Sequence, residues 1–197
     1  MGFVRQIEPK LRSIGLVAFP LLATVMLATL TRSGGNLGES APPTDDTLAS
    51  ARAHARFDDL IRKYAARYGV EAALIKAVMH AESDFRVRVR SLRGACGLMQ
   101  VMPRTGRAYG VRHLDDPNEN VRAGVRYLRF LLDVHDHDPE LAVAAYNAGS
   151  STVKQYGGIP PFPETRRYVA KVMRYRRRYQ SEMASLGAST AAPRSES

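Results

Sequence analysis

Glu82 is the residue whose type and position could do chemistry. The apolar residues Ile75 and Val78 lie seven and four positions before it, so on a helix all three share one face. The irregular segment 83–85 follows, which places Glu82 near the helix end. Apolar surroundings and the partial negative charge of a helix C-terminus both disfavour a carboxylate, so we expect a raised pKa. An acid that stays protonated near neutral pH suits cleavage of a glycosidic bond. The alternative is a solvated glutamate at a frayed helix end.

Three later segments carry polar and aromatic groups suited to holding a sugar. Residues 94–103 place Gln100, both a donor and an acceptor, near glycines that permit positive φ or close backbone approach. Tyr146 and Asn147 put a phenol and an amide at a helix end, and Glu164 stands at a helix start after a proline-rich loop. Each has a plainer interpretation: a turn entering a helix, a core tyrosine beside a helix stop, and a first-turn acid favoured by the helix dipole.

The sequence His-Asp-His-Asp at 135–138 looks like a metal-binding cluster. Histidines two positions apart do not share a helix face, however. We therefore interpret this segment as a solvated helix end and predict no metal site.

The elements that must position these groups are helical. The clearest apolar stripe covers residues 121–132 and follows Asp116-Pro117-Asn118, a plausible cap region. Further helices are expected over residues 57–64 with a stop at Gly69, over 74–82, from Pro139 to Gly149, and from Pro163 onward. Alternation of period two occurs at 86–90, which could be a small edge strand or an extended loop. The sequence therefore predicts a mainly α domain with little or no β-sheet.

Charge and cysteine content limit the class of protein. The 197 residues hold 29 Lys plus Arg and 19 Asp plus Glu, a net charge of 29 − 19 = +10, and one Cys. A single cysteine excludes an internal disulfide framework and a multi-cysteine zinc site. The positive balance predicts an anionic partner: nucleic acid, an acidic membrane surface or an acidic wall polymer. The densest basic block, Arg166–Arg178, is either a solvated helix face or a contact with the anionic envelope or nucleic acid. No nucleic-acid-binding motif supports the last reading.

The two ends differ from the middle of the chain. Residues 14–30 carry no charge and follow a basic start, which predicts export through a signal peptide or a retained membrane anchor within residues 1–33. Residues 34–51 are small, polar and proline-rich, as in a flexible linker. We expect a folded domain at 52–180 and a disordered tail at 181–197. The predicted location is the periplasm, with residues 14–30 as a possible inner-membrane anchor.

Several motifs occur in fixed order between about residues 57 and 179. They are Glu82-Ser83-x-Phe85, Ser91, Gly94-Ala95-x-Gly97-Leu98-Met99-Gln100, Met102-Pro103, Thr105, Asn120, Gly124, Tyr127-Leu128, Leu131-Leu132, Ala144-Ala145-Tyr146-Asn147-Ala148-Gly149, Gly158-Ile159-Pro160-Pro161, Glu164-Thr165 and Tyr168-Val169. Together they resemble the catalytic domain of soluble-type lytic transglycosylases. Val87 and Val89 depart from the family pattern, in which Pro and Ala are common at these positions. The family implies a lysozyme-like helical fold that cleaves bacterial peptidoglycan.

The resemblance also implies a role for each matching residue. Glu82 matches the single catalytic acid/base, and the substrate-binding matches are Ser91, Met99, Gln100, Tyr146, Asn147, Glu164 and Tyr168. The implied reaction cleaves the bond between N-acetylmuramic acid and N-acetylglucosamine, closes a 1,6-anhydro ring, and needs no metal or organic cofactor. The implied partners are peptidoglycan glycan strands, with secretion or division machinery as a further possibility. A hydrolytic muramidase of the same fold and a wall-binding protein without activity are the alternatives.

Overall fold

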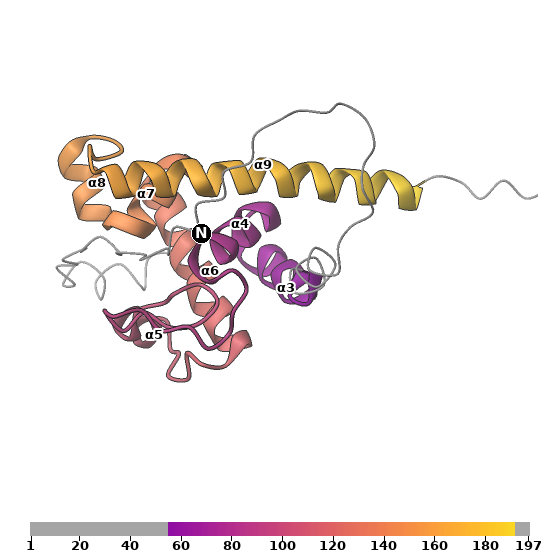
Figure 1. Ribbon diagram of the computed structural model, residues 1–197, viewed down its shortest axis with the longest axis horizontal. Coiled ribbons are helices and arrows are strands. Elements are labelled where there is room, and N and C mark those ends of the chain that lie inside the picture. Colours follow the sequence, from indigo (N-terminus) through magenta and orange to yellow (C-terminus); the bar gives the residue numbers. More distant parts are fainter. Residues whose placement is uncertain (1–54, 192–197) are drawn as a thin grey trace, which may run out of the picture.

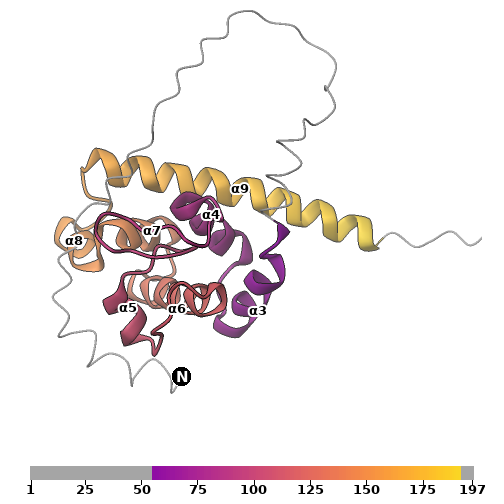
Figure 2. The same ribbon diagram turned by 60° about the horizontal axis from the view of Figure 1, so that its bottom comes forward.

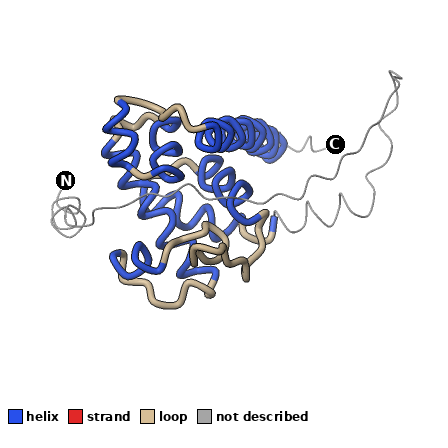
Figure 3. Tube along the Cα trace, turned by 60° about the vertical axis from the view of Figure 1, so that its left-hand side comes forward, coloured by secondary structure: helices blue, strands red, loops and turns tan. Residues whose placement is uncertain are grey.

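Helices make up the fold of the computed structural model, which describes residues 55–191. They are α3 (Asp58–Tyr68), α4 (Ala72–Ser83), α5 (Pro103–Ala108), α6 (Pro117–Val134), α7 (Pro139–Ala148), α8 (Ser150–Tyr156) and α9 (Pro163–Ala191). Within residues 55–191 the chain forms no strand, and only two isolated bridges pair Cys96 with Arg90 and Val101 (Figure 3). The prediction of a mainly α fold is therefore confirmed.

Helix α9 is the longest element and lies along one side of the domain, with α3, α4 and α6 all on the same side of it (Figures 1 and 2). Helix α4 packs mainly against α9, while α6 contacts α3, α5 and α7. Helix α5 and the long loop between α4 and α5 lie at the end of the domain farthest from α9 (Figure 1). The end of α4 therefore lies where α9 and this loop can both reach it.

The predicted start and stop signals act as helix ends. Asp116 caps α6 by accepting a hydrogen bond from the backbone N–H of Glu119, and Asp138 caps α7 in the same way. Proline follows each of these caps at the first helical position, where its missing N–H costs nothing. Gly69 ends α3 in the left-handed conformation, with φ 62° and ψ 40°.

Helix α6 supplies the centre of the core. Its apolar stripe, Val121, Val125, Leu128 and Leu131, is completely buried. Complete burial of each such side chain contributes roughly 1.5–3 kcal/mol. The predicted stripe over residues 121–132 is thus the face that joins α6 to the neighbouring helices.

Two segments need comment against the predictions. Residues 86–90 follow the second of the two alternatives, since they form an irregular loop with one bridge at Arg90. The final helix continues to Ala191, through the first part of the stretch predicted as a disordered tail from residue 181. This stretch includes glycine, serine and threonine, which are weak helix formers, but extending an existing helix avoids the cost of starting a new one.

The predicted export segment and linker, residues 1–33 and 34–51, lie outside the described residues, as do residues 192–197. Among residues 55–191, none of the helices is both long and apolar enough to cross a bilayer.

Candidate active site

Glu82 lies in the last turn of α4, one residue before the helix ends. Asp84 then adopts a left-handed conformation, with φ 51° and ψ 44°, which turns the chain away from the helix axis. Ile75 and Val78, on the same face of α4, are completely buried, whereas the Glu82 side chain is half-buried. The carboxyl group is thus held at the edge of the core, as the apolar spacing predicted.

Burial raises the pKa of Glu82 from 4.5 to about 7. Two groups act in the opposite direction: the hydrogen bond from Tyr168 and the positive charge of Lys171 both lower this pKa. The net result is a carboxyl group that is roughly half protonated at neutral pH. Such a group can donate a proton and, once ionised, take one back.

Helix α9 supplies both groups that oppose the effect of burial on Glu82. The Tyr168 hydroxyl donates to Oε1 of Glu82 at 2.6 Å. One turn later along α9, the Lys171 ammonium donates to the carbonyl oxygen of Ala81 at 3.0 Å. Because residues three apart share a helix face, Tyr168 and Lys171 contact the end of α4 side by side.

The loop between α4 and α5 is tied to Glu82 through the next residue. The Ser83 hydroxyl lies 2.8 Å from the carbonyl oxygen of Leu98 and 3.1 Å from that of Met79, one turn back in α4. Ser83 therefore connects the end of α4 to the glycine-containing segment at 94–100.

Asn120 of α6 holds this segment from the other side. Its side-chain oxygen accepts from the Met99 backbone N–H at 2.9 Å, and its amide nitrogen donates to the carbonyl oxygens of Cys96 and Leu114, both at 2.8 Å. A Cβ at Gly97 would lie 2.3 Å from this amide nitrogen, and the φ of Gly97 is 73°. Glycine is thus required at 97 both for space and for its backbone conformation.

The Tyr146 side chain contacts the backbone of Met99. The Tyr146 hydroxyl donates to the carbonyl oxygen of Met99 at 2.8 Å, and the Tyr146 ring lies 5.3 Å from that of Tyr127 between centroids. The side chain of Met99 is completely buried and packs where a Cβ at Gly124 would come within 2.4 Å of its sulfur. The Met99 side chain therefore supports the loop from beneath, and its role as a substrate-binding residue stays a prediction.

Gln100 and Ser91 also use their side chains to hold the loop. The Gln100 amide donates to the carbonyl oxygens of Gly97 at 2.9 Å and Val89 at 3.1 Å, and its backbone has a positive φ of 44°. The Ser91 hydroxyl accepts from the Ala95 backbone N–H at 3.0 Å. Both residues thus fix the loop that faces the end of α4.

Asn147 and Glu164 lie at the junction of α7 with α9. The side-chain oxygen of Asn147 accepts from the hydroxyl of Thr165, which is completely buried, at 2.9 Å. Oε1 of Glu164 is buried and has no hydrogen-bond partner within the described residues. Burial raises the pKa of Glu164, while Arg93 and Arg167 oppose this shift. An unpaired buried carboxylate oxygen is costly, so it is well placed to accept a hydrogen bond from a ligand.

Sequence reasoning missed two parts of this arrangement. Lys171 was assigned to the basic block of α9, and its contact with Ala81 required knowledge that α9 packs on α4. Tyr127 belongs to the family pattern, but its ring contact with Tyr146 depends on how α6 crosses α7. The spacing along α9 could have indicated the position of Lys171, because it lies one turn after Tyr168 and therefore on the same helix face.

The residues of the His-Asp-His-Asp segment separate in the structure. His135 is buried and lies 3.2 Å from the Ser150 hydroxyl, His137 contacts Arg129, and Asp138 caps α7. Among residues 55–191, no group of three or more His, Cys, Asp or Glu side chains is arranged to hold a metal ion.

Comparisons with a family model, with related sequences and with solved structures all indicate the same family. The family model described as the transglycosylase SLT domain matches residues 59–169. A relative from Haemophilus ducreyi, membrane-bound lytic murein transglycosylase C, is 38% identical over 112 residues, which make up 48% of this chain and 30% of the relative.

Two solved structures resemble the fold. The 70-kDa soluble lytic transglycosylase of Escherichia coli aligns with a TM-score of 0.60 and 29% identity, over 64% of this chain and 24% of that one. An inactive Glu-to-Gln mutant of the lytic transglycosylase of Pseudomonas aeruginosa aligns with a TM-score of 0.59 and 31% identity, again over 64% and 24%. The chain thus spans less than a third of the length of these matches.

Proposed function

The chain belongs to the transglycosylase SLT domain family, and on that premise we propose that it is a peptidoglycan lytic transglycosylase. Its substrate is the glycan strand of murein, and the bond cleaved joins N-acetylmuramic acid to N-acetylglucosamine. The names of the Haemophilus and Escherichia relatives, which act on murein, support this substrate class.

The observation that carries the proposal is the environment of Glu82. Its pKa of about 7 is set by burial, Tyr168 and Lys171, and neither of these two neighbours is a carboxylate. An ordinary retaining glycosidase places a second carboxylate roughly 5 Å from the first, and its charge would raise the pKa of the acid. The arrangement therefore favours one carboxyl group that acts first as acid and then as base.

The reaction follows from this single group. Protonated Glu82 donates its proton to the glycosidic oxygen, the bond from that oxygen to the anomeric carbon of the muramyl residue breaks, and N-acetylglucosamine leaves with a free hydroxyl. The Glu82 carboxylate then accepts the proton of the muramyl C6 hydroxyl, whose oxygen bonds to the anomeric carbon. The product ends in 1,6-anhydro-N-acetylmuramic acid, Glu82 regains its proton, and water is not consumed. The chain's own residues supply every proton transfer.

The surrounding residues have separate parts in binding. Tyr168 holds the Glu82 carboxyl group at the reacting distance, and the Tyr146 ring forms an aromatic surface near it. The unpaired oxygen of Glu164 accepts a hydrogen bond from the glycan or its peptide. Asn147 positions the start of α9 through Thr165. Holding the glycan in a reactive geometry is the main contribution of such groups.

Ser91, Gln100 and Met99 complete the proposed binding residues. All three shape the loop at 91–100, two through hydrogen bonds to its backbone and Met99 through buried packing. We propose that this loop forms one wall of the glycan site.

The domain organisation and location follow the same proposal. Residues 1–33 serve export or anchoring, 34–51 link them to the enzyme domain, and the chain acts in the bacterial envelope. The relatives named membrane-bound and soluble murein transglycosylases support an envelope location.

Product analysis tests the proposal directly. Purified peptidoglycan is digested with the protein, and the soluble products are separated and weighed by mass spectrometry. We expect anhydromuropeptides, which are lighter by one water than the products of hydrolysis. Products with reducing ends alone would instead establish a hydrolytic muramidase.

Two variants assign the chemistry to Glu82. Glu82→Gln should abolish cleavage while leaving the helical circular dichroism unchanged. Asp84→Asn, two residues away, is the matched control, because it removes an exposed carboxylate and asparagine tolerates the left-handed conformation found there. Activity retained in Glu82→Gln would refute the assigned role.

A further inference from the structure

The outer face of α9, defined here as Arg166, Ala170, Arg174 and Arg177, has no role in the glycan site. Successive members lie four, four and three residues apart, so they share one face of the helix. All four are exposed. The stripe extends from Arg166 to Arg177, or about 16 Å along the helix.

The positive charges of the three arginines on this face are not paired with acidic side chains among residues 55–191. None forms an ion pair with an acidic side chain in the part of the chain that the structure describes. Their neighbours differ: Arg176 pairs with Glu71 at 2.6 Å, and Arg178 pairs with Glu182 at 2.7 Å. The outer face therefore retains its positive charge, while the adjacent arginines are neutralised by partners.

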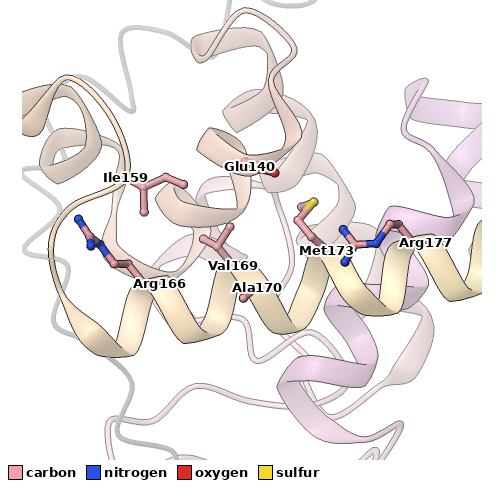
Figure 4. A pocket seen from close by; sticks show the side chains of 7 residues that line it. All are labelled: Glu140, Ile159, Arg166, Val169, Ala170, Met173 and Arg177. Atoms are coloured by element: carbon pink, nitrogen blue, oxygen red, sulfur yellow. The ribbon is translucent and has the colours of Figure 1, made fainter.

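A hollow of about 520 Å³ adjoins the outer face on the side toward α7 (Figure 4). Val169, Ala170 and Met173 of α9 line it together with Ile159 of the preceding loop. Arg166 and Arg177 stand at its two ends, and Glu140 of α7 lies across from Met173 (Figure 4). Val169 and Met173 are buried, with 5% and 7% of their surface exposed, whereas Ala170 is exposed and Ile159 is half-buried. The apolar surface that the hollow offers is therefore that of Ala170 and Ile159, bounded along the helix by two cations.

This surface is separate from the Glu82 site. Tyr168, whose hydroxyl contacts Glu82, lies on another side of α9. Lys171, which contacts Ala81, lies between the two sides, one turn before Arg174. Tyr168 is separated from Arg166, Ala170 and Arg177 by roughly half a turn around the helix. A partner on the outer face would leave the Glu82 side of α9 free.

We propose that the outer face of α9 and its hollow dock on an anionic phospholipid bilayer. Arginine is suited to this partner because its planar guanidinium binds phosphate through paired hydrogen bonds. A row of cations about 16 Å long can contact several phosphates at once. The exposed Ala170 and the half-buried Ile159 then face the glycerol and upper acyl region, whereas an acidic wall polymer would satisfy the arginines but leave these two side chains in water.

Docking in this way orients the enzyme. The outer face rests on the membrane, and the Glu82 side of α9 is directed away from it, toward the glycan layer. The surface thus concentrates the domain at the membrane and presents the site to its substrate.

Vesicle binding of the full chain tests the proposal. The triple variant Arg166→Gln, Arg174→Gln, Arg177→Gln is compared with the unchanged chain on vesicles of phosphatidylglycerol and phosphatidylcholine, and on phosphatidylcholine alone. Each arginine near an anionic surface contributes roughly a fivefold factor, so partitioning onto the anionic vesicles should fall by about 100-fold at low salt. Partitioning onto the neutral vesicles should not change, since residues 1–54 are the same in both proteins.

The control variant carries Arg104→Gln, Arg107→Gln and Arg112→Gln, which removes the same charge from exposed positions in and after α5. It should keep most of the binding to anionic vesicles. Cleavage of solubilised glycan strands should be unchanged in both variants, which shows that each is folded.

Two results would overturn the proposal. An equal loss in the two triple variants would mean that net charge alone drives binding. Unchanged vesicle binding together with weaker sedimentation on purified peptidoglycan would identify an acidic wall polymer as the partner of the outer face.

A second variant tests the hollow apart from the charges. Ala170→Glu places a carboxylate on the exposed part of the lining and keeps all three arginines. It should weaken binding to anionic vesicles by at least tenfold, and Ala170→Leu should keep it. Unchanged binding in Ala170→Glu would contradict contact between the hollow and the bilayer.

Discussion

Replacing Tyr168 by phenylalanine should move the pH range in which the enzyme works. The Tyr168 hydroxyl donates to Glu82 at 2.6 Å, and this hydrogen bond lowers the pKa of Glu82 against the effect of burial. Tyr168→Phe keeps the ring and its packing but removes the donor. Burial and Lys171 then act alone, and the pKa of Glu82 should rise above its present value of about 7.

The size of the shift follows from the strength of the bond. A hydrogen bond to a charged group contributes about 1.5–3 kcal/mol, and one pKa unit corresponds to about 1.4 kcal/mol. Loss of the bond therefore raises the pKa by about one to two units. The lower figure applies here, because the half-buried carboxylate gains water in place of the hydroxyl. We expect a pKa of Glu82 about one unit higher in the variant.

The assay is the dependence of kcat/KM on pH with solubilised glycan strands. Because the first step requires protonated Glu82, kcat/KM is constant at low pH and falls as pH rises through the pKa of the free enzyme. In Tyr168→Phe this fall should occur about one pH unit higher, while the value at low pH is reduced because the carboxyl group is less well positioned. A fall at an unchanged pH would refute the reasoning that Tyr168 stabilises the carboxylate.

Tyr146→Phe is the matched control for this experiment. The Tyr146 hydroxyl donates to the carbonyl oxygen of Met99 rather than to Glu82. Loss of this hydrogen bond should lower activity by loosening the loop, but kcat/KM should still fall at the same pH as in the unchanged chain. The same shift in both variants would mean that any change near the site perturbs Glu82.

Three further predictions concern the same network. Because the pKa of Glu82 is higher in the folded chain than its ordinary 4.5, the folded state binds more protons between pH 4.5 and about 7, and stability is lost as pH rises through that window. Glu82→Gln should therefore match the unchanged chain at pH 4 but exceed it by up to about 3 kcal/mol at pH 8, measured by urea unfolding; a constant difference across pH would contradict the raised pKa. Lys171→Met removes a cation that lowers the pKa of Glu82, so kcat/KM should fall at a higher pH in this variant. Lys171→Arg keeps the positive charge, so its kcat/KM should fall at the same pH as in the unchanged chain. Equal pH profiles for the two variants would show that the charge of Lys171 is not involved. Asn120→Leu leaves the N–H of Met99 and two buried carbonyls without partners, so it should lower the free energy of unfolding by about 3 kcal/mol or more, whereas a loss below 1 kcal/mol would show that the three bonds contribute little.

Helix positions could be predicted from the sequence because their signals are local. The stripe at 121–132, the cap at Asp116 and the helix start at Pro139 each depend on residues within one or two turns. The end of α9 could not be placed in this way. Composition suggested a loose tail after residue 180, but a helix already formed by packing on α4 can extend without the cost of a new nucleus.

The candidate site was predictable only in part. The position of Glu82 at the edge of the core followed from its spacing to Ile75 and Val78, which share its helix face. The partners of polar side chains did not follow, because they depend on contacts between distant segments. The side chains of Gln100 and Met99, for example, hold the loop from within, and their contact with the substrate stays a prediction. A motif identifies which residues matter, and the tertiary structure decides which of them face a ligand.

The dual role proposed for Glu82 explains why α9 is attached to α4 at this point. A buried carboxyl group alone would have a pKa too high for it to act as a base after it has given up its proton. A solvated one would be ionised too early to act as an acid. Tyr168 and Lys171 offset part of the effect of burial, and they do so from one helix face, one turn apart. Any displacement of α9 along α4 would therefore remove both groups together and return Glu82 to the behaviour of a buried acid. The contact between α4 and α9 is thus as important for the proposed reaction as it is for the stability of the fold.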